Sequence, residues 1–108
     1  MEMNNIVGRK VSWKGQLRRI VGIERETEKA ILAKIRNVRG LTDEEDEMRW
    51  EEYRKKQIKM IKEYLSIAKS ERRKKEAEEN LKALEEGWEE LMWIPKSVIE
   101  RVRFLSRG

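Results

Sequence analysis

Apolar and polar positions alternate with a strand-like period near the start of the chain. Residues 6–13 and residues 16–24 alternate in part, and Lys14-Gly15 between them is a turn signal. A polar connection leads to a third strand-like run, residues 29–38, and Gly40 ends it. This pattern predicts three antiparallel strands in a meander.

The pattern changes to a helical period at Thr42. Thr42-Asp43-Glu44-Glu45 has the form of a capping box, with further acids where a helix dipole favours them. Apolar residues then recur three and four positions apart up to Ala68, and again from Ala77 to Trp88. Gly87 suits a C-terminal stop. The sequence therefore predicts a helical segment over residues 42–87.

This helical segment allows two geometries. One unbroken helix would be on the order of 65 Å long, which leaves its ends too far apart to feed one small domain. A hairpin avoids this. Residues 69–76 contain no apolar side chain, and we expect the chain to reverse around residues 66–70. The alternative keeps the helix straight and exchanges the last strand between two chains in a coiled-coil, domain-swapped dimer.

The chain after the helical segment contains a short motif with a resemblance. A strand is predicted over residues 88–94, and its last two residues begin the motif Trp93-Ile94-Pro95-Lys96-Ser97-Val98-Ile99. This run resembles the end of Src-homology-3-like (SH3-like) barrels, where a strand enters a Pro-containing helical turn and then a short closing strand. Together with Lys29-Ala30-Ile31-Leu32 it is similar to small proteins of phages and archaeal mobile elements. The resemblance covers the strand-rich ends and implies a fold rather than an activity.

These observations predict an α+β fold. We expect a small antiparallel SH3-like β-barrel interrupted by a long, coiled-coil-like helical hairpin. Residues 1–41 would form the first part of the barrel, residues 42–87 the insertion, and residues 88–108 the last part of the barrel. The paired aromatic and acidic loop residues of the Src-homology ligand domains are not found, so binding of Pro-rich peptides is not implied.

The amino-acid composition excludes several kinds of active site and metal site. The 108-residue chain has no Cys and no His, which removes thiol nucleophiles, Cys/His zinc sites and the usual proton shuttle. We find no catalytic constellation and expect neither an enzyme nor a cofactor. Without a secretory leader or a bilayer-length apolar run, we expect an intracellular, cytoplasmic protein. Abundant Lys, Arg and Glu is typical of proteins from hot environments, although any protein with charged helices shows it.

Charge is distributed unevenly. Formal net charge is +6 over residues 1–41, −2 over residues 42–87 and +1 over residues 88–108. An excess of positive charge on a compact domain indicates a polyanionic partner. The candidate nucleic-acid contacts are Arg9, Lys10, Lys14, Arg18, Arg19 and Arg25, joined by Arg101 and Arg103 if these lie on one side of a closing strand. A basic but inert barrel surface, and an edge that discourages strand addition, are the alternatives.

Aromatic residues divide into two groups. Trp13 is assigned to the barrel core, and the alternative is a stacking platform for single-stranded nucleic acid among the basic residues. Trp88 and Trp93 are assigned to the barrel core and its junction with the insertion. A wide apolar stripe on the helical segment could pack internally or bind a partner or a second copy, and its candidate contacts are Trp50, Tyr53, Met60 and Tyr64.

The acidic run 43–47 is assigned to helix capping, since consecutive helical residues point in different directions and cannot converge on a metal ion. The basic run 72–75 at the hairpin tip is assigned to a solvated turn, and contact with a nucleic acid or an acidic protein surface is the alternative.

Two functional hypotheses follow. The first is a nucleic-acid-binding accessory protein whose basic barrel contacts phosphates and whose helical insertion mediates dimerisation or partner contact. The second is a protein-interaction module, such as a mobile-element inhibitor that binds a host nucleic-acid-processing complex through its helical hairpin. No membrane and no small-molecule substrate is expected in either case.

Overall fold

The computed structural model describes the backbone of residues 6–105 and the side chains of residues 6–100. The chain divides into two compact units. The sheet unit contains residues up to Val38 and from Glu90 onward, and the helical unit is Arg39–Glu89. The fold is α+β, and each unit is described below by itself.

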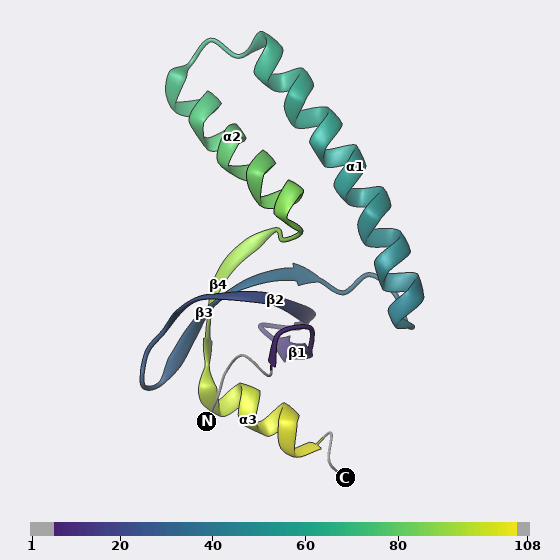
Figure 1. Cartoon of the computed structure of the whole chain (residues 1–108), viewed down its shortest axis with the longest axis vertical. Helices are drawn as coiled ribbons and strands as arrows, with labels where there is room; N and C mark the ends of the chain where they lie inside the picture. Colours follow the sequence, from purple (N-terminus) through teal and green to yellow (C-terminus); the bar gives the residue numbers. More distant parts are fainter. Residues whose placement is uncertain (1–5, 106–108) are drawn as a thin grey trace. The chain divides into compact units, whose positions relative to one another are not determined.

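Four antiparallel strands form the sheet, in the order β1-β2-β3-β4 (Figure 1). They are β1 (Lys10–Trp13), β2 (Gln16–Glu26), β3 (Ala30–Asn37) and β4 (Glu90–Pro95). The predicted meander is therefore confirmed, although the first strand begins at Lys10 and not at residue 6. The reason is a turn before it, in which Gly8 has a φ of 93° and the Arg9 amide donates to the Ile6 carbonyl at 3.0 Å.

The turn between β1 and β2 has two residues, both with positive φ. Lys14 has a φ of 53° and Gly15 a φ of 78°. Two positive φ values are the signature of the type I′ turn, whose twist matches that of a tight hairpin. Glycine accepts this conformation without strain, whereas lysine adopts it at a cost.

Strand β2 carries two irregularities that curl the sheet. Its register against β3 shifts between Ile20 and Gly22 and again between Ile23 and Arg25. Each shift adds one residue to β2, and such bulges bend a strand and increase its twist. The described strands thus form a curled sheet of half-barrel form.

The core lies on one face of this curled sheet. Its buried residues come from the strands, from the turn before β1 and from the C-terminal helix α3 (Lys96–Leu105), and they are Ile6, Val11, Ile20, Ile31, Ala33, Ile35, Ile94 and Ile99. Trp13, Ile23, Met92 and Val98 pack against them. Trp13 is therefore part of the core, as the sequence indicates.

The helix α3 replaces a predicted element. A helical turn followed by a closing strand was expected after Pro95, and this is wrong because residues 96–105 form one helix. Val98 and Ile99 both contact the core. Adjacent residues of a strand point to opposite faces, whereas adjacent residues of a helix can share a buried side. In a helix both Val98 and Ile99 can contact the core, whereas in a strand only one of them could.

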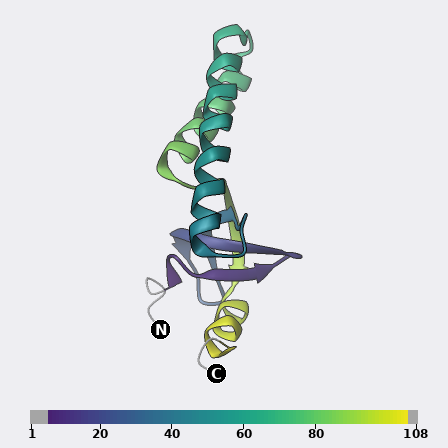
Figure 2. The same ribbon diagram turned by 90° about the vertical axis from the view of Figure 1, so that its right-hand side faces the viewer.

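The helical unit contains α1 (Asp43–Ile67) and α2 (Glu71–Glu86), joined by three residues (Figures 1 and 2). Thr42 caps α1, since its hydroxyl accepts from the Glu45 amide at 3.1 Å. Gly87 ends α2 in the left-handed conformation, as the sequence predicts. The unbroken-helix alternative is wrong, because the chain leaves helical geometry at Ala68 and starts a new helix after Ser70.

The two helices of this unit contact each other. Arg54 of α1 donates from Nε to the Leu84 carbonyl at 2.8 Å, near the C-terminal end of α2. None of the helices in the described part of the chain has the length and apolar content needed to cross a bilayer.

Candidate nucleic-acid interface

The sheet has a second face, opposite the core, which we call the outer face. Side chains alternate along a strand and directly paired residues share a face. Because Ile31, Ala33 and Ile35 of β3 are buried in the core, Leu32 and Lys34 between them belong to the outer face. The strand register then shows which residues of the neighbouring strands lie on the outer face.

Register arranges the outer face in three rows across the strands. The first row is Arg25–Leu32–Trp93 and the second is Gly22–Lys34–Leu91. The third is Lys10–Arg19–Arg36. Successive rows are two residues apart on β3, or about 7 Å.

Three of the predicted nucleic-acid contacts are brought together here. Lys10 pairs directly with Arg19, and Arg25 lies two rows away on the same face. Arg25 is exposed, while Lys10 and Arg19 are half-buried. Arg19 also donates from Nη1 to the Gly8 carbonyl at 2.6 Å, which fixes its position beside Lys10.

Lys34 is a member of this face that sequence reasoning missed. Its side chain is 30% exposed, and its Nζ lies 3.6 Å from a Glu24 carboxylate oxygen. The signal was present in the alternation of Ile31, Ala33 and Ile35, which puts Lys34 on the face opposite to them. Arg36 continues the third row but is buried, so it adds charge without an exposed head group.

Arg18 does not belong to the outer face, which corrects the predicted set. It pairs with core residue Val11 and is 7% exposed. Its Nε donates to the Trp13 carbonyl at 3.1 Å and its Nη1 to Asn37 Oδ1 at 3.3 Å, with a Glu90 carboxylate at 3.8 Å. A guanidinium buried in this way needs these acceptors, so Arg18 serves the fold.

The remaining predicted cations lie apart from the rows. Arg9 precedes β1 and Lys14 is in the β1–β2 turn, and both are exposed. Arg101 and Arg103 belong to the backbone of α3 and not to a closing strand, and their side chains lie outside the described residues, as does Arg107.

Large apolar side chains are also exposed on the outer face. Trp93 is 44% exposed, Leu91 41% and Leu17 45%. The assignment of Trp93 to the core is therefore wrong. In β4, Met92 and Ile94 face the core, so alternation turns Trp93 outward. Trp88 is half-buried in the helical unit, where its indole nitrogen donates to Glu86 at 3.1 Å.

The predicted partner contacts of the helical unit are divided by burial. Trp50 is 1% exposed and cannot reach a partner, and Tyr53 is half-buried against it with ring centroids 6.0 Å apart. Met60 and Tyr64 are 52% and 38% exposed. The internal packing of the stripe thus accounts for its first two aromatic residues.

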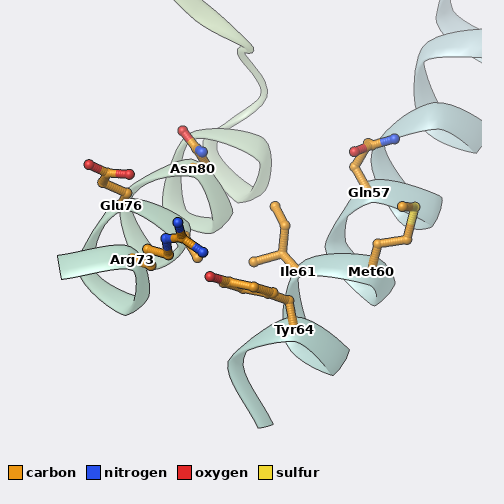
Figure 3. A pocket seen from close by; sticks show the side chains of 8 residues that line it. Gln57, Met60, Ile61, Tyr64, Arg73, Glu76 and Asn80 are labelled. Carbon is orange, nitrogen blue, oxygen red and sulfur yellow. The ribbon is translucent and has the colours of Figure 1, made fainter. Parts of the chain in front are cut away.

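Met60 and Tyr64 line a groove between α1 and α2 of about 490 Å³. Figure 3 shows Tyr64 and Ile61 pointing from α1 toward Arg73 on α2. Gln57, Glu76, Ala77 and Asn80 complete the lining. The groove is of mixed polarity, which distinguishes it from a purely apolar docking surface.

The acidic start of α1 serves the fold. Asp46 is fully buried, and its Oδ1 accepts from the Arg39 amide at 2.7 Å. The Glu45 carboxylate accepts from the Leu41 amide at 3.1 Å. These contacts agree with the assignment of this run to helix capping. Over the described residues there is no group of three acidic side chains placed to hold a metal ion.

Comparisons with known proteins give no independent indication of function. A scan against protein-family models, a search of curated proteins and a search of solved structures each returned no match to this chain.

Proposed function

We propose that the protein is a non-enzymatic nucleic-acid-binding accessory protein, and that the outer face of its sheet unit contacts phosphates. The observation that carries this is the third cross-strand row, in which Lys10, Arg19 and Arg36 are consecutive neighbours. Neighbouring cations on one face of a compact unit give a positive surface potential, and such a potential attracts phosphates.

The wider charge distribution supports the proposal. Over the full sequence, residues 1–38 and 90–108 hold thirteen Lys/Arg against six Asp/Glu, a formal net charge of +7. Residues 39–89 hold thirteen against fifteen, a net charge of −2. Positive charge is therefore concentrated in the unit that carries the rows, and such a field attracts polyanions at long range.

A salt series measured by fluorescence anisotropy tests the proposal. With four cations of the outer face (Lys10, Arg19, Arg25 and Lys34) at phosphates, log K should fall against log salt with a slope of about −3. Arg25→Gln should weaken binding and reduce that slope by somewhat less than 1. Lys59→Gln, an exposed change on α1, is the matched control and should leave both unchanged.

Two results would overturn the proposal. One is a wild-type protein that binds labelled DNA and RNA no better at low salt than at high salt. The other is an equal effect of Arg25→Gln and Lys59→Gln, since this would show that net charge matters and the outer face does not.

The likeness to SH3-like barrels of phages and archaeal mobile elements remains part of the proposal. The four-stranded meander that ends at Pro95 supports it. The helix α3, in place of a helical turn and closing strand, is a departure from that pattern.

A second candidate function uses the helical unit, for dimerisation or contact with a protein of a nucleic-acid-processing complex. The exposed Met60 and Tyr64 beside the α1–α2 groove favour it. Light scattering of the wild type and of Met60→Ala with Tyr64→Ala would detect self-association and its loss. A monomer at all concentrations, with no partner released by these changes, would contradict this role.

A further inference from the structure

The outer face combines its cations with an exposed indole, and this combination limits the class of ligand that the face can bind. Trp93 is directly opposite Leu32, which is directly opposite Arg25. Lys34 is the diagonal neighbour of Trp93, within reach of long and aromatic side chains. The flat aromatic side chain on β4 therefore has positive charge beside it on β3, at Lys34, and one strand further away on β2, at Arg25.

The surface around Trp93 is left uncovered by the way Lys34 lies. A Cβ placed on Gly22 would be 3.6 Å from Lys34 Cδ, so the lysine stem extends over the glycine of β2. Its Nζ continues toward Glu24, also on β2. Lys34 thus leans away from β4, where Leu91 and Trp93 remain 41% and 44% exposed.

We infer that Trp93 is a stacking platform for an unpaired base and that the ligand of the outer face is a single-stranded nucleic acid. This inference rests on the proposed function. Bases of a single strand can place their faces on an indole while the phosphates contact Arg25 and Lys34. In a duplex those faces are stacked on each other, and a phosphate-only ligand would leave Trp93 and Leu91 without a role.

The inference also predicts little dependence on base sequence. Every base has a π face, and Leu91 and Leu32 beside Trp93 offer no hydrogen-bond donor or acceptor from their side chains. Recognition on this face would come from stacking and charge rather than from base edges.

Three ligands of equal length separate stacking from charge. They are a labelled single strand of about 12 nucleotides, the duplex of the same strand, and a strand of the same length in which the bases are absent. The single strand should bind about tenfold or more tightly than the abasic strand at the same salt concentration. Both strands should show similar salt slopes, since both carry the same phosphates.

Variants of Trp93 then assign the stacking to this residue. Trp93→Ala should lose about tenfold affinity for the single strand, keep the salt slope, and bind the abasic strand as the wild type does. Trp93→Phe should keep most of the single-strand affinity. Met48→Ala, a change of a large exposed apolar side chain in the helical unit and away from the α1–α2 groove, is the control and should have no effect. Circular dichroism and thermal unfolding confirm that each variant is folded.

The outcomes are distinguishable from failure of the proposed function. If none of the three ligands shows salt-dependent binding, the proposed function itself fails. If all three bind with the same salt-dependent affinity, or if Trp93→Ala binds the single strand as the wild type does, phosphate contact stands and the stacking inference is overturned.

Discussion

The side chains of Arg39 and Glu89 form a two-pronged ion pair that joins the first residue of the helical unit to its last. The second of the two hydrogen bonds, from Nη2 to Oε2, measures 3.0 Å. The same guanidinium lies 3.9 Å from the Tyr53 ring centroid and 5.5 Å from that of Trp50. Parallel hydrogen bonds of this kind are stronger and more specific than a single contact.

Removing the carboxylate of this pair should destabilise the protein. Glu89→Gln leaves the Arg39 guanidinium, whose side chain is 19% exposed, facing a neutral amide. We expect a loss of about 1–3 kcal/mol in the free energy of unfolding. Thermal unfolding followed by circular dichroism measures it. Glu85→Gln, on an exposed residue near the end of α2, is a control for loss of charge alone, and an equal effect of both changes would show that the ion pair is not the cause.

Substitutions of Arg18 and Arg25 should have different effects, the first on the stability of the protein and the second on its binding of nucleic acid. Arg18→Gln removes the donors to Trp13 and Asn37 inside the sheet unit. It should lower the free energy of unfolding by about 1–3 kcal/mol. Arg25→Gln, on an exposed side chain, should leave the melting temperature nearly unchanged while it weakens nucleic-acid binding. A melting temperature that responds to Arg25→Gln and not to Arg18→Gln would contradict this division.

Glu24 should act as an internal competitor for the phosphate. Its carboxylate lies 3.6 Å from Lys34 Nζ, on the strand that also carries Arg25. Glu24→Gln releases that contact and removes a negative charge, so single-strand affinity should rise several-fold at low salt and less at high salt. Anisotropy titrations at two salt concentrations measure the effect. Glu28→Gln, in the β2–β3 connection, is the control. An equal gain in affinity from Glu24→Gln and Glu28→Gln would show that the change in net charge is the cause and that the contact with Lys34 is not.

Lys14 should be replaceable with a gain in stability. Its φ of 53° is costly for lysine and acceptable for asparagine, which type I′ turns favour before glycine. Lys14→Asn should therefore raise the free energy of unfolding by about 0.5–1 kcal/mol. Chemical denaturation is the measurement. A decrease in stability would show that the lysine side chain makes a stabilising contact that outweighs its backbone cost.

Ile99 should test the role of α3 as a cover for the core. It is 4% exposed, and Ile99→Ala should cost about 2–4 kcal/mol through the cavity it leaves. Ser97→Ala, on the exposed side of the same helix, should change stability by less than about 0.5 kcal/mol. Near-equal effects would mean that α3 does not contribute to the core.

Local signals in the sequence determined most of the secondary structure. Thr42 with Glu45 marks the start of α1, Gly87 marks the end of α2, and Lys14-Gly15 marks the hairpin. Each of these is a property of a few neighbouring residues, because caps and turns satisfy backbone groups or positive φ values within one turn of chain. The curl of the sheet was less accessible, since a bulge in β2 appears only when β2 is paired with β3.

Tertiary structure decided which side chains are available for function. Arg18 and Arg19 are adjacent and chemically identical in the sequence, yet one is buried among core residues and the other lies on the outer face. Trp13 and Trp93 are both in strands, yet Trp13 packs on the core and Trp93 does not.

The C-terminal segment shows the same limit. The sequence of residues 101–104 alternates in a way that suits a strand, but Val98 and Ile99 both pack on the core, and a helix is the conformation that permits this. The physical reason is common to all three cases. The period of a strand assigns residues to two faces, and only pairing with β3 and packing of α3 determine which face becomes the core.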